Sequence, residues 1–205
     1  LPLSELAMTA FYSLDHSVHL TAECTNHCKD NTFAFGACFA EVEVDIPLGK
    51  VKVLRIVNVH DSGKLINPKL AEAQVHGGMS MGLGYALSEE MKFDPRTGRL
   101  LNGNLLDYKL PTSMDTPELT ALFVETDDPS GPFGNKALGE PPAIPVAPAV
   151  RNALLQATGV AVNDLPLNPQ KLVERFTAAG LIQVVSTVPG LAVVLGVDQT
   201  GLLDI

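Results

Sequence analysis

The chain has 205 residues, of which 46% are hydrophobic and 18% are charged. This composition supports a packed core in one large domain or two small ones, and it excludes a disordered chain. The net charge of -9 argues against nucleic acids and anionic membranes as partners, because both attract basic surfaces. No apolar run is long and uninterrupted enough to predict a membrane span.

The first apolar runs predict short strands over residues 3–10 and 16–21. A third strand is expected over 34–45, where apolar and charged side chains alternate, and a change of face near Ala40 indicates a β-bulge. A turn and then a further strand over 51–59 follow, so this region predicts a β-hairpin.

Three cysteines, Cys24, Cys28 and Cys38, occur in a sequence without a recognisable secretory leader. We therefore expect free thiols and a cytoplasmic location. Cys24 and Cys28, with His27 beside them, also suggest a zinc site and hence a structural zinc protein. The second ligand pair of known zinc patterns is missing, so a turn with free thiols is the favoured interpretation.

Asn67 and Pro68 predict the start of a helix, because Asn caps helix N-termini and Pro favours the first helical position. The helix is expected to extend to about Met91. It contains four glycines, each of which costs a helix about 1 kcal/mol relative to Ala. These glycines are Gly77, Gly78, Gly82 and Gly84. They suggest close packing on more than one side, so we expect this helix to be buried.

The second half of the chain predicts strands and then helices. Before residue 130 a turn is expected over 94–98 and strands over 105–110 and 118–125. A helix is predicted over 143–157 and is closed by Gly159. The Asn-Pro pair at 168–169 predicts a last amphipathic helix, which extends to about Ala179. Mixed strands and helices without an internal repeat indicate an α+β fold.

The run over residues 131–142 places three glycines and three prolines around one carboxylate, Glu140. Glycine permits close approach of the backbone to a ligand, and proline tends to open a helix. We interpret the run as a pinched loop that brings Glu140 to a helix N-terminus, where an ionised carboxylate is favoured. Taken alone, a connector of this composition is more often a surface loop.

Four segments, in order, resemble the molybdenum hydroxylases, the family of xanthine dehydrogenase and aldehyde oxidase. The loop over 131–142 resembles the active-site loop of this family, and the run over 73–84 resembles its glutamine-bearing helix beside the molybdopterin cofactor. The runs over 36–45 and 107–112 resemble two further family strands. The resemblance covers roughly residues 8–182 and also includes the turn Asp61-Ser62-Gly63.

The resemblance implies a molybdopterin-type molybdenum cofactor, with iron-sulfur clusters and FAD on other domains or subunits. It implies that Glu140 is the general base in the hydroxylation of a purine or similar N-heterocycle with water-derived oxygen. Lys136 would face the cofactor phosphate, a carboxylate or solvent, and Gln74 is either a cofactor ligand or an amide satisfied inside its helix. The residues expected at the cofactor are Gln74, Gly134, Asn135, Lys136, Ala137, Leu138 and Gly139.

The resemblance also implies a division of the chain. Residues 1–182 are expected to form the C-terminal part of a molybdopterin-binding domain. Residues 183–205 are unassigned, and they are interpreted as an extra hairpin, a partner contact or non-native sequence. Activity would require the rest of the molybdenum subunit together with iron-sulfur and FAD subunits. A non-catalytic supporting subunit and an aldehyde- or nicotinate-type hydroxylase are the open alternatives.

Overall fold

The structure is a computed structural model that describes residues 2–13, 21–25, 30–188 and 191–196, with side chains described up to residue 183. The chain divides into two compact units, residues 1–31 and 32–205. Among its described residues, the first unit contains one helix, α1 (Leu3–Tyr12). The strand predicted over 3–10 is therefore wrong, because Leu, Glu, Ala and Met favour a helix. The strand predicted over 16–21 lies outside the described residues except for its last position.

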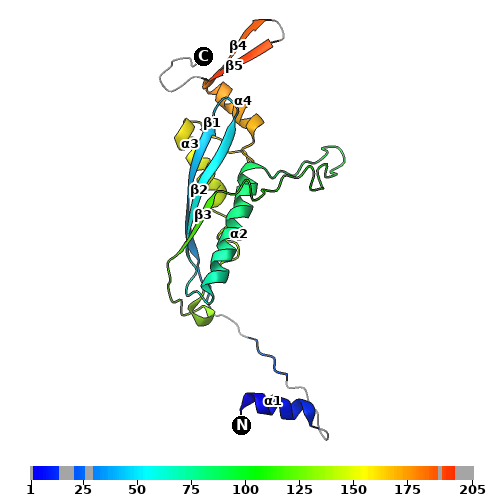
Figure 1. Cartoon of the computed structure of the whole chain (residues 1–205), viewed down its shortest axis with the longest axis vertical. Helices are drawn as coiled ribbons and strands as arrows, with labels where there is room; N and C mark the ends of the chain where they lie inside the picture. Colours follow the sequence, from blue (N-terminus) through cyan, green and yellow to red (C-terminus); the bar gives the residue numbers. More distant parts are fainter. Residues whose placement is uncertain (1, 14–20, 26–29, 189–190, 197–205) are drawn as a thin grey trace. The chain divides into compact units, whose positions relative to one another are not determined.

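The second unit is built on a three-stranded sheet in the order β1-β2-β3 (Figure 1). Strands β1 (Phe35–Asp45) and β2 (Lys50–Asp61) form the predicted antiparallel hairpin. The register shifts between Glu41 and Val42, which confirms the predicted β-bulge next to Ala40. Strand β3 (Glu118–Phe123) pairs with β2 in parallel, so β2 and β3 end at the same edge of the sheet.

Helix α2 (Pro68–Leu87) connects these parallel strands and begins as predicted, with the side chain of Asn67 accepting from the backbone N–H of Leu70. It ends four residues earlier than expected. The expected burial of this helix holds only in part. Val75 and Met79 are fully buried on one face, whereas Met81 and Tyr85 are more than 60% exposed on the other. Gly78 and Gly82 pack against residues 142–146, Gly84 is buried against Glu89 and Pro111, and Gly77 meets no neighbour.

Two further helices complete the core. Helix α3 (Val146–Thr158) ends at Gly159 as predicted, but it begins three residues late because residues 141–145 form turns. Helix α4 (Pro169–Ala178) begins at the predicted Asn168 cap. The core joins β2 to α2, α3 and α4. Its largest fully buried side chains include Phe176, Ile56, Met79, Leu154 and Leu172.

Residues 105–107 form a turn and residues 108–110 have no regular secondary structure, so the predicted strand is absent from this segment. The side-chain oxygen of Asn104 accepts from the backbone N–H groups of Leu106 and Asp107, which turns the chain locally. Leu105 and Leu106 are about 80% exposed, so no core contact favours a strand there. No helix in the described part of the chain is long and apolar enough to cross a membrane.

The chain continues past α4 into an antiparallel hairpin of β4 (Ile182–Val188) and β5 (Leu191–Gly196). This pairing agrees with one of the three interpretations of residues 183–205, the extra hairpin. The domain boundary at residue 182 stays a prediction. With its strand and helix regions packed in one unit, the structure confirms the α+β fold class.

Candidate functional site

The loop over residues 131–142 is attached to the C-terminal end of β2 by backbone hydrogen bonds. The N–H of Lys136 donates to the carbonyl oxygen of Ser62 (2.7 Å), and the N–H of Lys64 donates to that of Gly134 (2.8 Å). Gly63 and Asn135 form a β-bridge between these bonds. A Cβ atom on Gly63 would collide with this loop backbone, and its φ of 68° also favours glycine. The close approach therefore requires glycine at this position.

A buried ion pair strengthens the same attachment. Nζ of Lys136 lies 2.7 Å from Oδ2 of Asp61, and the two side chains are 5% and 20% exposed. Oδ1 of Asp61 accepts from the N–H of Gly63 (3.0 Å) and from the hydroxyl of Thr126 (2.7 Å). The hydrogen bond from Lys136 is the main cause that lowers the pKa of the Asp61 carboxyl below its usual range. Of the environments expected for Lys136, the structure shows a carboxylate.

A second attachment point lies at the other end of the loop. Nδ2 of Asn58 donates to the carbonyl oxygen of Pro142 (2.9 Å), and Asn58 is fully buried. Gly78 of α2 packs against the same proline, because a Cβ placed on it would lie 2.5 Å from Cβ of Pro142. The segment from Lys136 to Pro142 is thus held at both ends by the body of the fold.

Between these points the loop presents its backbone to solvent. Ala137, Gly139 and Glu140 are exposed. Within the described part of the chain, the backbone N–H groups of residues 137–140 make no hydrogen bond. Unpaired donors on an exposed, glycine-containing loop suit an anionic ligand with hydrogen-bond acceptors, and a molybdopterin phosphate or pterin offers such acceptors.

Gln74 and the loop line one pocket of about 250 Å³, although they come from separate elements. The loop residues in this lining are Asn135, Lys136 and Leu138. Gln74 is exposed on α2, and its side chain makes no hydrogen bond within the described residues. It is therefore available to a ligand and is not an amide satisfied inside a buried helix. The donor set of this pocket fits the cofactor that the resemblance implies.

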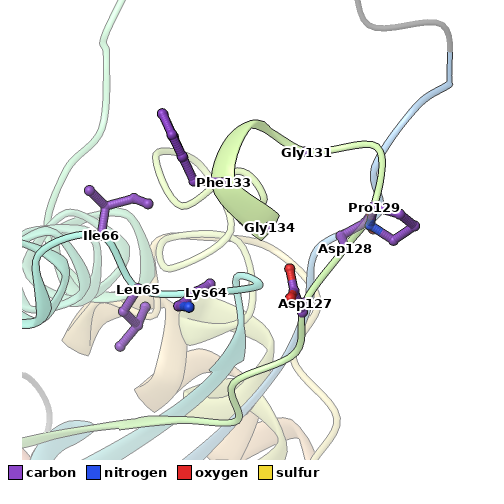
Figure 2. A pocket seen from close by; sticks show the side chains of 9 residues that line it. All are labelled: Lys64, Leu65, Ile66, Asp127, Asp128, Pro129, Gly131, Phe133 and Gly134. Atoms are coloured by element: carbon purple, nitrogen blue, oxygen red, sulfur yellow. The ribbon is translucent and has the colours of Figure 1, made fainter.

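The remaining predicted site residues lie elsewhere on the loop. Gly134 lines a larger, adjacent pocket of about 730 Å³, which Figure 2 shows between residues 64–66 and 127–134. Phe133 on its rim is 86% exposed and has a φ of 56°, which is uncommon for a residue other than glycine. Ala137, Gly139 and Glu140 are in the lining of neither pocket. The structure thus brings Gln74 together with three of the loop residues.

His60 is excluded as an accessible acid-base group at this site. It is fully buried near the end of β2, and burial lowers the pKa of its imidazole. Neither ring nitrogen has a hydrogen-bond partner among the described residues. A Cβ on Gly36 would lie 2.8 Å from Nδ1, so glycine on β1 leaves the space that the ring occupies.

The zinc interpretation depends on His27 and Cys28, which lie outside the described residues. Within the described ranges, no group of three or more His, Cys, Asp or Glu side chains could hold a metal ion. Cys24 and Cys38 are free thiols. Sequence reasoning did not find Asn58 or Thr126. Asp61 was identified only in its local turn, since the partner of its carboxylate lies 75 residues away.

Several known proteins are similar to this chain in sequence. The sequence model of the molybdopterin cofactor-binding domain matches residues 2–117. A putative xanthine dehydrogenase molybdenum-binding subunit of Escherichia coli is 54% identical over 180 residues, which are 88% of this chain and 24% of that protein. An aldehyde oxidoreductase molybdenum-binding subunit of Escherichia coli is 38% identical over 143 residues, which are 69% of this chain and 20% of that protein.

A solved structure shares the fold. The Cu,Mo-CO dehydrogenase in its carbon monoxide reduced state superposes with a TM-score of 0.71 and 28% identity, covering 88% of this chain and 23% of that one. The chain therefore spans about a quarter of the length of the relatives that it matches.

Proposed function

Since this chain belongs to the molybdopterin cofactor-binding domain family of the molybdenum hydroxylases, we propose that it carries the catalytic loop of a xanthine-dehydrogenase-like enzyme. The proposed reaction is the hydroxylation of a purine or similar N-heterocycle with oxygen from water. The observation that carries the proposal is the pocket that Gln74 shares with the loop. Glu140 is exposed near the C-terminal end of the same loop.

The roles of the residues follow from this arrangement. The molybdenum cofactor, when bound, supplies the redox chemistry. Gln74 and the unpaired N–H groups of residues 137–140 would hold it through hydrogen bonds. The carboxylate of Glu140 would accept the proton that the water-derived oxygen must lose before it attacks the substrate carbon. The carbonyl of Glu140 accepts from the N–H of Ala143 (3.0 Å), so its backbone is fixed in a turn.

The substrate class is supported by the difference between relatives. Identity to the xanthine dehydrogenase subunit is 54%, against 38% for the aldehyde oxidoreductase subunit. This difference favours a heterocycle over an aldehyde, with an aldehyde- or nicotinate-type substrate as the alternative that substrate profiling tests.

We also propose that this chain works with the remainder of a molybdenum subunit and with iron-sulfur and FAD subunits. The matched residues make up only 24% and 20% of these two relatives, which are named as subunits. Helix α2 supports this proposal, because Leu70, Met81 and Tyr85 form an exposed apolar side that another part of such an assembly would cover. The free thiols of Cys24 and Cys38 support a cytoplasmic location.

The substitution Glu140→Gln in the assembled enzyme tests the proposal. Loss of the general base is expected to lower turnover of xanthine by about 10²-fold or more while molybdenum content is retained. Glu125→Gln is the matched control, since Glu125 is likewise exposed and its side chain, like that of Glu140, makes no hydrogen bond in the described part of the chain. Unchanged turnover in Glu140→Gln would contradict the assignment and favour a supporting, non-catalytic role.

A further inference from the structure

We infer that Asn58 and Asp61, at the C-terminal end of β2, are positioning residues that hold the Glu140 carboxylate in its working place. They do so by fixing the two ends of the segment that carries it. The inference rests on the proposed function of Glu140 as general base, and it assigns to β2 a role that no local motif indicates.

Asp61 fixes the first end of the segment. Its carboxylate faces Nζ of Lys136 at 2.7 Å, four residues before Glu140. Two hydrogen bonds orient that carboxylate: one from the N–H of Gly63, just after β2, and one from the hydroxyl of Thr126, just after β3. Nζ of Lys136 also lies 5.4 Å from the centroid of the Phe35 ring on β1, which favours the same position for the cation.

Asn58 fixes the second end. It is three residues before Asp61 on the same strand, and its Nδ2 atom donates to Pro142, two residues after Glu140. The bond is buried and joins residues 84 apart in the sequence. A buried hydrogen bond of this kind is costly to leave unmade, so it restrains the carbonyl of Pro142 strongly.

Between these two points the loop has few further contacts: Leu138 packs against the core, and the carbonyl of Glu140 accepts from the N–H of Ala143. The N–H groups of residues 137–140 have no partner within the described residues. Gly139 has open space where a side chain would be. The attachments at Lys136 and Pro142 therefore set the position of Glu140 together with its turn to Ala143. A general base must lie within hydrogen-bond reach of the proton that it takes, and a displacement of about 1 Å can cost about 10²-fold in rate.

Asn58→Leu in the assembled enzyme removes the second attachment and keeps a side chain that branches at Cγ. We expect kcat per molybdenum atom to fall by about tenfold or more while KM changes by less than about threefold. The matched control is Asn102→Leu. Nδ2 of Asn102 donates in the same way to a backbone carbonyl, that of Glu90 (2.7 Å), on another loop. The kcat per molybdenum atom of the Asn102→Leu enzyme should stay within about twofold of wild type.

Asp61→Asn is a milder change, because an Asn oxygen can still accept from Gly63 and Thr126 while the charge opposite Lys136 is lost. If the Asn58→Leu enzyme does not assemble, Asp61→Asn tests the positioning role instead. We expect the same fall in kcat per molybdenum atom. Asp164→Asn is its control, since Asp164 pairs with Arg175 at 2.8 Å on an exposed surface.

The proposed function of Glu140 and the positioning role of Asn58 and Asp61 can be contradicted by different results. A Glu140→Gln enzyme that keeps its turnover contradicts the proposed function itself. If Glu140→Gln loses turnover but Asn58→Leu and Asp61→Asn keep kcat per molybdenum atom within about twofold, the positioning role is overturned. The same holds if molybdenum content and activity fall in proportion, because the loop would then serve cofactor retention and not the base.

Discussion

Nζ of Lys136 lies 2.7 Å from Oδ2 of Asp61, and the two residues are 75 positions apart in the sequence. Every other ion pair in the described part of the chain has both side chains at least 40% exposed. Exposed pairs contribute little to stability, whereas a buried partner that loses its counter-charge is costly. The Lys136 pair is therefore the ion pair expected to matter for both the fold and the loop.

The contribution of Asp61 to stability should depend on pH. The hydrogen bond from Lys136 lowers the pKa of this carboxyl in the folded state below its ordinary value of 3.8. Its stabilising effect is then fully present above the pKa of the unfolded chain and is lost as pH falls through the lower folded pKa. At pH 7 Asp61→Asn should lower the free energy of unfolding by about 1 kcal/mol.

Denaturant unfolding of wild type and Asp61→Asn from pH 7 down to pH 3 measures this difference. The difference in the free energy of unfolding between the two proteins should shrink as the pH falls into the range where a free Asp titrates. A difference that stays constant or grows on acidification would show that the carboxylate charge does not contribute.

Two adjacent glycines of α2 should respond in opposite ways to alanine. A Cβ on Gly78 would lie 2.5 Å from Cβ of Pro142 and 3.1 Å from the N atom of Ala143, whereas a Cβ on Gly77 meets nothing within 4 Å. Gly78→Ala is expected to lower the free energy of unfolding by about 1–3 kcal/mol through overpacking. Gly77→Ala should raise it by up to about 1 kcal/mol, because alanine is the better helix former.

Thermal melting of both glycine variants gives the comparison, and Gly77→Ala controls for the change in helix propensity. Equal melting temperatures for the two would mean that α2 does not approach the 142–143 segment as closely as the structure shows.

The two described thiols should differ in reactivity. Burial raises the pKa of Cys38 from 9.0 to about 11, which lowers its thiolate fraction at pH 8 by about 100-fold relative to a free thiol. Cys24 is exposed. Iodoacetamide at pH 8, followed by peptide mapping, should therefore label Cys24 well before Cys38. Labelling in denaturant serves as the control and should equalise the rates; equal rates in the folded protein would contradict the burial of Cys38.

Much of the fold could be predicted because its signals are local. The Asn-Pro pairs at 67–68 and 168–169 mark helix starts, and Gly159 ends a helix, through contacts within a few residues. The apolar runs over 3–10 and 105–110 misled the prediction. Composition alone does not show whether an apolar run finds a partner strand, and Asn104 turns the second run before one can form.

Candidate site residues could be singled out from the sequence, but the contacts that hold their loop in place could not. Gln74 and the loop could be singled out from the sequence, and the structure places Gln74 at one pocket with Asn135, Lys136 and Leu138. The attachments through Asn58 and Asp61 join residues that are 84 and 75 positions apart in the sequence, so no local pattern encodes them. The catalytic role of Glu140 stays a prediction.

The parallel pairing of β2 with β3 places the candidate site and the connection that enters β3 at opposite ends of these strands. Residues 55–60 pair with 118–123, and the segments that meet in Figure 2 both leave the sheet at the far end of this pairing. The long excursion between α2 and β3 departs from the opposite end of the helix (Figure 1). Insertions or deletions there would leave the strand register intact. That excursion can therefore change length in evolution or in engineering without moving Lys136 or Glu140.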